Sequence, residues 1–104
     1  MTKALRTHNE AEAEIRAALM WYETERVGLG RELWDELQHT LDLISEHPAI
    51  GGVVHRVRIR GTARRVPLRR FPYFVVYREH VDHVEVIALA HTSRRPGYWR
   101  SRGV

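Results

Sequence analysis

The second half of the chain combines arginines with aromatic residues, which is a pattern that suits an anionic partner. Its arginines include Arg64, Arg65, Arg69, Arg70, Arg94, Arg95, Arg100 and Arg102, and its aromatic residues include Tyr73, Tyr77, Tyr98 and Trp99. Guanidinium groups bind phosphate and carboxylate in planar geometry, and aromatic rings stack on nucleobases. The pattern predicts a surface for nucleic acid or for an acidic protein, and long-range attraction does not separate the two. The alternative is that many of these arginines are solvated and that the rings belong to the core.

His91 is the histidine whose position favours acid–base chemistry. It follows the apolar residues 84–90, so we expect it at a strand end, held at the edge of an open sheet face. An imidazole there can donate or accept protons near neutral pH. With Arg64 or Arg65 neutralising charge and Tyr98 orienting a phosphodiester, His91 would complete a metal-free ribonuclease. The alternative is a strand-end histidine that makes only structural contacts.

Other classes of site are not indicated by the sequence. The chain has no cysteine, which removes disulfides and thiolate zinc sites and fits a reducing cytosol. His80, Asp82 and His83 share one turn, which we interpret as solvated rather than as a cation site. No apolar run approaches about 18 residues, and no signal peptide is visible at the N-terminus. We therefore expect a cytoplasmic protein with no metal, no cofactor and no membrane contact.

The charge is divided unevenly along the chain. Residues 1–50 carry five Lys/Arg and ten Asp/Glu, a net of −5, whereas residues 51–104 carry twelve Arg and three Asp/Glu, a net of +9. The two values add to the overall net charge of +4. A mildly acidic half beside a strongly basic half indicates one face built for an anionic partner.

The first half of the chain has a helical pattern. Apolar residues recur at helical spacing between Ala11 and Tyr22, and Asn9 with Glu12, or Thr7 with Glu10, can cap this first helix. A second helix is expected over residues 30–46, because its leucines form one stripe and Pro48 cannot continue the hydrogen-bond ladder. Two helices joined by a short turn form an antiparallel hairpin.

The second half has a strand pattern. We expect extended segments over residues 56–60 and 64–68, a strand over 74–78, a turn over 79–83 and an interior strand over 84–90, with a further short strand near residues 3–7. The basic and aromatic C-terminal end has no period, and we expect Pro96 and Trp99 to anchor it on the sheet. The predicted architecture is α+β in the order β-α-α-β-β-β, one domain over residues 1–104. Its helical hairpin packs on one face of a small, mainly antiparallel sheet, and the other face is open and edged by arginines.

Four segments in order resemble the RelE/ParE toxin superfamily. Residues 64–77 (RRVPLRRFPYFVVY) resemble its R-R-x-x-L-x-x-F-P-Y segment, and residues 91–99 (HTSRRPGYW) resemble its closing H-x-x-R-x-P-x-Y-W segment. Residues 11–22 (AEAEIRAALMWY) are similar to its first helix, and Ile44 with Pro48 to the end of its second. The likeness runs over residues 9–102.

This resemblance implies the toxin of a type II toxin–antitoxin module, bound and neutralised by a cognate antitoxin. ParE-like members act on DNA gyrase and block replication, whereas RelE-like members cleave mRNA in the ribosome without a metal. The absence of lysine after Lys3, the long helical hairpin and residues 71–73 resemble the ParE-like group more closely. In that group the C-terminal end matters for toxicity.

Three functions follow as expectations, and the third is a silent binding module that retains the fold but leaves growth unaffected. In the first, the chain binds gyrase, and its target-binding residues are Arg69, Arg70, Tyr77, Arg94, Arg95, Trp99 and Arg102. In the second, it is a ribosome-dependent mRNA endonuclease with Arg64, Arg65, His91 and Tyr98 as the catalytic set.

Overall fold

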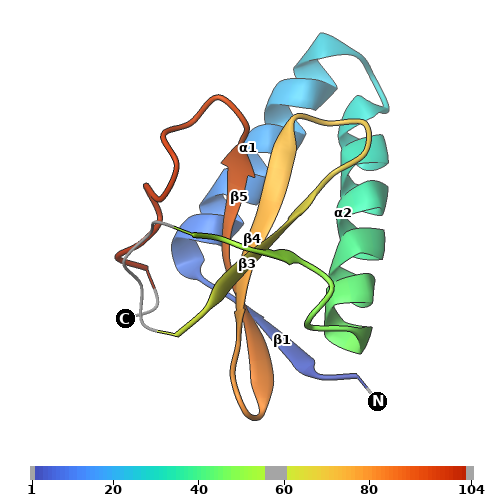
Figure 1. Cartoon of the computed structure of the whole chain (residues 1–104). Coiled ribbons are helices and arrows are strands. Elements are labelled where there is room, and N and C mark those ends of the chain that lie inside the picture. Colours follow the sequence, from blue (N-terminus) through green and yellow to red (C-terminus); the bar gives the residue numbers. More distant parts are fainter. Residues whose placement is uncertain (1, 56–60, 103–104) are drawn as a thin grey trace.

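The computed structural model describes residues 2–55 and 61–102. In chain order its elements are β1 (Ala4–Thr7), α1 (Asn9–Glu25), α2 (Leu29–Glu46), β2 (Gly52–Val53), β3 (Ala63–Pro67), β4 (Tyr73–Glu79) and β5 (His83–His91). The strands form a five-stranded sheet of order β1-β5-β4-β3-β2. The two helices pack beside this sheet (Figure 1). β1 is parallel to β5, and the other neighbouring strands are antiparallel. The predicted α+β class, with a helical hairpin on one face of a mainly antiparallel sheet, is confirmed.

Two parts of the strand layout were not settled by the sequence pattern. The pattern does not predict β2, because two residues that include a glycine show no alternation of polar and apolar side chains. The extended segment expected over residues 56–60 lies outside the described residues. No helix in the described part of the chain is both long and apolar enough to cross a membrane.

The helical hairpin depends on contacts at its turn and at the start of α1. The cap of α1 is His8, whose Nδ1 accepts a hydrogen bond of 3.1 Å from the backbone N–H of Glu10, so the expected caps Asn9 and Thr7 are wrong. The carboxylate of Glu23 accepts hydrogen bonds of 3.0 Å from the backbone N–H groups of Gly28 and Gly30, at the start of α2. A Cβ atom at Gly30 would lie 2.8 Å from the Leu19 carbonyl oxygen, so the close crossing of the helices requires glycine there.

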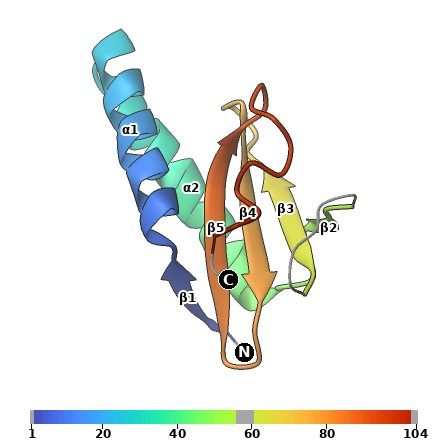
Figure 2. The ribbon, with the colours of Figure 1, turned by 90° about the vertical axis from the view of Figure 1, so that its left-hand side faces the viewer.

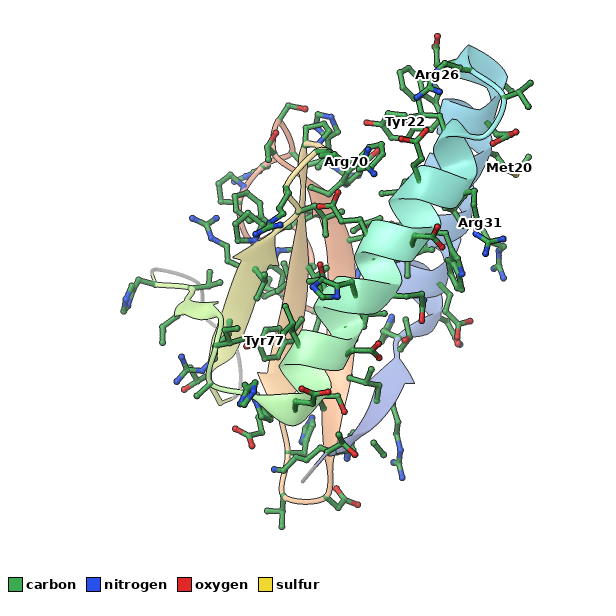
Figure 3. The ribbon with its side chains drawn as sticks, turned by 90° about the vertical axis from the view of Figure 1, so that its right-hand side faces the viewer. Met20, Tyr22, Arg26, Arg31, Arg70 and Tyr77 are labelled. Atoms are coloured by element: carbon green, nitrogen blue, oxygen red, sulfur yellow. The ribbon has the colours of Figure 1, made fainter. Side chains whose placement is uncertain are left out.

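The two faces of the sheet are covered by different segments. The helices cover one face with a large apolar cluster that includes Leu33, Leu37, Ile44, Val75 and Tyr77. Figure 3 shows Tyr77 between the sheet and the C-terminal half of α2. On the opposite face, residues 92–102, hereafter the tail, turn back over the sheet (Figure 2).

The sequence suggested that the face away from the helices is open. The structure shows instead that the tail covers it. Trp99 of the tail is 3% exposed and packs in a second cluster with Ala63, Val76, Ile87 and Ala90. The expectation that Trp99 anchors the tail on the sheet is confirmed. Tail and helices together bury most of both sides of the strands.

A β-bulge in β5 changes which side chains face the helices. Tyr77 pairs with Val86, but its neighbour Val76 pairs with Ala88, so Ile87 is the extra residue. A bulge reverses the alternation of faces beyond it, because side chains alternate with a period of two. Downstream of Ile87, the odd-numbered residues therefore face the helices, and His91 is among them.

Candidate basic protein-binding surface

Several arginines come together where β3 and β5 end and β4 begins. These three strand ends meet at one edge because β4 is antiparallel to both of its neighbours. The loop of residues 68–72 contacts the start of the tail through a hydrogen bond of 2.8 Å from the Thr92 N–H to the Pro72 carbonyl. The fold thus places Arg69 and Arg70 of the loop and Arg94 and Arg95 of the tail at the same edge of the sheet, although they lie far apart in sequence.

The arginines of the loop differ in how firmly they are held. Arg70 Nη1 lies 2.9 Å from a Glu32 carboxylate oxygen, and Figure 3 shows this side chain pointing toward the N-terminal half of α2. This hydrogen bond raises the pKa of Arg70 above its usual value. Glu36 of α2 also accepts hydrogen bonds from the backbone N–H groups of Arg69 and Arg70. Acidic residues of α2 therefore fix the loop, and Arg70 is part of that attachment.

At this edge, four exposed arginines, hereafter the basic end, make no ion pair among the described residues: Arg65, Arg69, Arg94 and Arg95. Two of them stack on rings. The Arg65 guanidinium carbon lies 4.3 Å from the centre of the Phe74 ring, and that of Arg94 lies 3.9 Å from the centre of the Tyr98 ring. Stacking on the ring face leaves the N–H edges of a guanidinium free to donate to an anion.

Glu14 of α1 holds the tail in place. Its carboxylate accepts hydrogen bonds from the Tyr98 hydroxyl at 2.6 Å and from Arg102 Nη1 at 2.8 Å. It also accepts a hydrogen bond of 3.1 Å from the Leu89 N–H of β5. Arg102 Nε additionally pairs with Glu10 at 2.7 Å. Sequence reasoning missed Glu14, because its partners are 75 to 88 residues away and no local pattern marks such pairs.

Three residues that the sequence predicted as target-binding have structural roles instead. Tyr77 is 0% exposed, donates its hydroxyl to the Pro48 carbonyl at 2.7 Å and accepts from the Gly51 N–H at 2.8 Å. Trp99 is buried in the second cluster, as described above. Only 11% of the Arg102 side chain is exposed, and its guanidinium is bound to the acidic residues of α1. Because these side chains are buried or are bound to acidic residues, we do not include them in the proposed binding surface.

The proposed catalytic set is only partly brought together. His91 packs against the Tyr73 ring with ring centres 5.1 Å apart, which places it on the helix side and not at an open face. Its Nδ1 accepts a hydrogen bond of 3.0 Å from the Ser93 N–H and lies 2.7 Å from the Ser93 hydroxyl. Burial and the bond to Glu14 raise the pKa of Tyr98 far above its usual value.

The two candidate charge-neutralising arginines lie on opposite faces. Arg64 pairs in register with Tyr77, and its Nη1 donates to the Gly51 carbonyl at 2.9 Å, so it fixes the segment before β2. Arg65 lies on the tail side, where it lines a cavity together with His91 and Tyr98. Of the proposed catalytic residues, three therefore share one site and Arg64 does not.

Two hollows adjoin the tail. A small cavity of about 60 Å³ lies beneath it, bounded by Arg65, Phe74, Arg94 and Arg95. A more open groove of about 240 Å³ runs between α1 and the end of β5, with Trp21 and His91 in its walls. Within residues 2–55 and 61–102, no cluster of three histidine, aspartate or glutamate side chains is placed to hold a metal ion.

Comparisons with known proteins agree with this architecture. The family described as "ParE toxin of type II toxin-antitoxin system, parDE" matches residues 5–96. A solved structure described as "Chromosomal ParDE TA system from P. aeruginosa" superposes with a TM-score of 0.72 and 13% sequence identity. The match covers 88% of this chain and 98% of that one. No curated protein matches the chain. Because the family match spans most of the sequence, the chain belongs to the ParE toxin family of type II toxin–antitoxin systems.

Proposed function

We propose that this ParE-family toxin inhibits DNA gyrase by binding it through the basic end, and that a cognate ParD-type antitoxin neutralises it. The observation that carries the proposal is the set of exposed arginines without acidic partners, gathered by the fold at one end of the sheet. Arginine fits planar carboxylate groups, which makes an acidic protein surface a suitable target. We infer that gyrase is this target because the sequence resembles ParE-like toxins, which act on gyrase.

The side-chain contacts also favour binding over catalysis. The Tyr98 hydroxyl is bound to Glu14. One ring nitrogen of His91 accepts hydrogen bonds from Ser93. Both groups are thus engaged in holding the tail and the strand end. A binding surface needs no free proton donor or acceptor, whereas an acid–base pair does.

A supercoiling assay with purified gyrase and the purified chain tests the proposal. We expect inhibition that increases with toxin concentration and weakens at high salt, because contacts between exposed charges are screened. A variant with Arg69→Gln, Arg94→Gln and Arg95→Gln should not inhibit at the wild-type concentration. Arg16→Gln, an exposed arginine of α1, provides the matched control. Unchanged supercoiling at saturating wild-type toxin would reject the proposal.

The antitoxin is proposed to use another surface. Exposed apolar side chains of the helical hairpin include Met20, Trp21 and Trp34, which are 70%, 56% and 40% exposed. Trp34 also lines a groove of about 340 Å³ between the two helices, together with Ile15 and Leu37. An antitoxin segment with apolar anchors would bury this surface. A stable complex of that kind typically buries on the order of 1,600 Å². Co-purification of the two chains, lost on Trp34→Asp, tests this docking site.

The second candidate function is a ribosome-dependent mRNA endonuclease. One observation favours it, namely that Arg65, His91 and Tyr98 line the same cavity. It predicts that His91→Ala abolishes toxicity while antitoxin binding survives. Labelling of newly made DNA and protein after toxin induction separates the two functions. Gyrase inhibition stops DNA synthesis first, whereas mRNA cleavage stops protein synthesis first and is visible as cut messages on primer extension.

A further inference from the structure

The small cavity beneath the tail has the features of a site for one anionic group. It lies between the tail and the sheet face that the helices do not cover, and its volume is about 60 Å³. One water molecule needs roughly 10–15 Å³ of space measured in this way, so the cavity accommodates a group of several heavy atoms. A carboxylate with its adjoining methylene is of this size, whereas a nucleobase is larger.

The charge around this cavity is of one sign. Arg65 comes from β3, and Arg94 and Arg95 come from the tail. None of the described lining residues is acidic. The nearby carboxylate of Glu14 does not compensate these cations, because it is bound to Arg102 and Tyr98. An anion that entered would meet uncompensated positive charge.

The remaining lining determines which anion fits best. Val54, Val76, Ala90 and Trp99 contribute apolar surface to the cavity. A phosphate carries oxygens on all sides, and those facing this apolar surface would lose their hydrogen bonds to water without replacement. The side chain of a glutamate or aspartate instead has methylene groups at one end and a carboxylate at the other. It can place each end against matching surface.

Two of the arginines are already held in position. Arg65 is stacked on Phe74 and Arg94 on Tyr98, with distances of 4.3 and 3.9 Å to the ring centres. Glu14 fixes Tyr98 in turn through its hydroxyl. Side chains that are ordered before binding lose less conformational entropy when the ligand arrives, which strengthens the interaction.

We propose that this cavity binds the carboxylate of a single glutamate or aspartate side chain presented by a protein partner. The carboxylate lies between the guanidinium groups of Arg65 and Arg94, and its methylene groups contact Val76 and Ala90. The partner's identity rests on the proposed function, since gyrase supplies the acidic side chain there. The chemistry of the site does not depend on that identity.

The test is a titration of the isotope-labelled full chain, followed by the backbone amide signals in NMR spectra. The added compounds are N-acetylglutamate amide, its glutamine counterpart and inorganic phosphate, at equal ionic strength. We expect saturable shifts at Ala90, Thr92 and Gly97 with the glutamate compound, and at least tenfold weaker binding of the other two. Arg65→Gln and Arg94→Gln should each weaken glutamate binding about tenfold, as loss of one charge-assisted hydrogen bond predicts. Arg16→Gln should leave it unchanged.

Each other outcome overturns the proposal. Equal shifts with the glutamine compound would show that the carboxylate is not recognised, and tighter binding of phosphate would make the site a phosphate site. Absence of saturable shifts at these amides would show that the cavity is not a site. The amide spectrum also reports whether each variant is folded. If the glutamate compound binds but the toxin does not affect supercoiling, the proposed carboxylate site is supported and the gyrase proposal is rejected.

Discussion

The two faces of the sheet are covered in contrasting ways. The helices cover one face with large aliphatic side chains, and Leu33, Leu37 and Ile44 are each no more than 1% exposed. The tail covers the other face with one large side chain, Trp99, over small residues such as Ala63 and Ala88. Its position is then fixed by polar contacts to Glu14. Apolar packing dominates on the helix side, and directional hydrogen bonds set the geometry on the tail side.

The two kinds of contact have different roles, since one mainly stabilises the fold and the other mainly positions side chains. Burial of apolar area is non-directional and contributes most of the free energy of folding. Hydrogen bonds and ion pairs contribute less net free energy each, but they fix the place of the groups that make them. We therefore expect changes on the helix face to unfold the chain. Changes at the tail should displace the basic end and leave the rest folded, as a local opening.

The largest expected effect comes from Leu37→Ala in α2. Leu37 is 1% exposed in the helix-side core, so its truncation leaves a cavity and should lower the free energy of unfolding by about 3–5 kcal/mol. Denaturant unfolding followed by circular dichroism measures this loss. The matched control is Val27→Ala, which is 87% exposed and should change stability by less than about 0.5 kcal/mol. Similar losses in the two variants would contradict the assignment of the core.

Trp99→Ala tests the tail side of the comparison. Burial of such a side chain contributes about 2–3 kcal/mol, and we expect its removal to release the tail without unfolding the helices. Hydrogen exchange should then rise at residues 92–102 and stay low in α2. Uniform loss of protection across the chain would mean that the two faces form one cooperative unit, and the comparison would fail.

Glu85 gives a prediction for pH dependence. Burial raises the pKa of this carboxyl, but hydrogen bonds from His80 and Arg78 at 3.0 and 2.9 Å outweigh it and hold the pKa below the ordinary value of 4.5. A carboxyl with a lowered pKa stabilises the fold above pH 4.5, and that contribution is lost as the pH falls through the folded pKa. Glu85→Gln should cost about 2 kcal/mol at pH 7 and flatten the acid limb of the stability curve. An unchanged acid limb would show that other carboxyls control it.

Glu14→Gln is expected to have the smallest effect on stability, about 1 kcal/mol, because an amide retains part of the hydrogen bonding. The tail should nevertheless be cut faster by trypsin at its arginines, since it loses its ionic contacts with Arg102. Glu12→Gln is the control, because Glu12 is an exposed glutamate two residues before Glu14 on the same helix. Equal cutting rates in both variants would show that Glu14 does not hold the tail.

Local patterns in the sequence predicted the elements of this fold. The apolar stripe of α2, its end before Pro48 and the run of β5 each depend on residues close in sequence, and all three were located correctly. The bulge at Ile87 has no such signature, so the expected position of His91 beside an open face is wrong. The side of the sheet that a strand-end residue faces depends on the register of the whole strand. One extra residue earlier in the strand reverses that side.

The tail also shows that sequence patterns do not predict contacts between residues that lie far apart in the chain. Composition predicted that Trp99 anchors it, because a large apolar ring in a basic segment needs a place to be buried. Its attachment to Glu14 depends on a pairing across most of the sequence, which only the folded chain brings about. For the same reason Arg102 was expected to contact a target, whereas its guanidinium binds the acidic residues of α1.

The central claim is that the basic end binds the target while the rest of the chain supplies the scaffold. The most direct measurement is inhibition of gyrase supercoiling by the variant carrying Arg69→Gln, Arg94→Gln and Arg95→Gln, compared with wild type and with Arg16→Gln. We predict that wild type and Arg16→Gln inhibit equally and that the triple variant, with unchanged unfolding free energy, does not inhibit. Inhibition by the triple variant at the wild-type concentration would contradict the account.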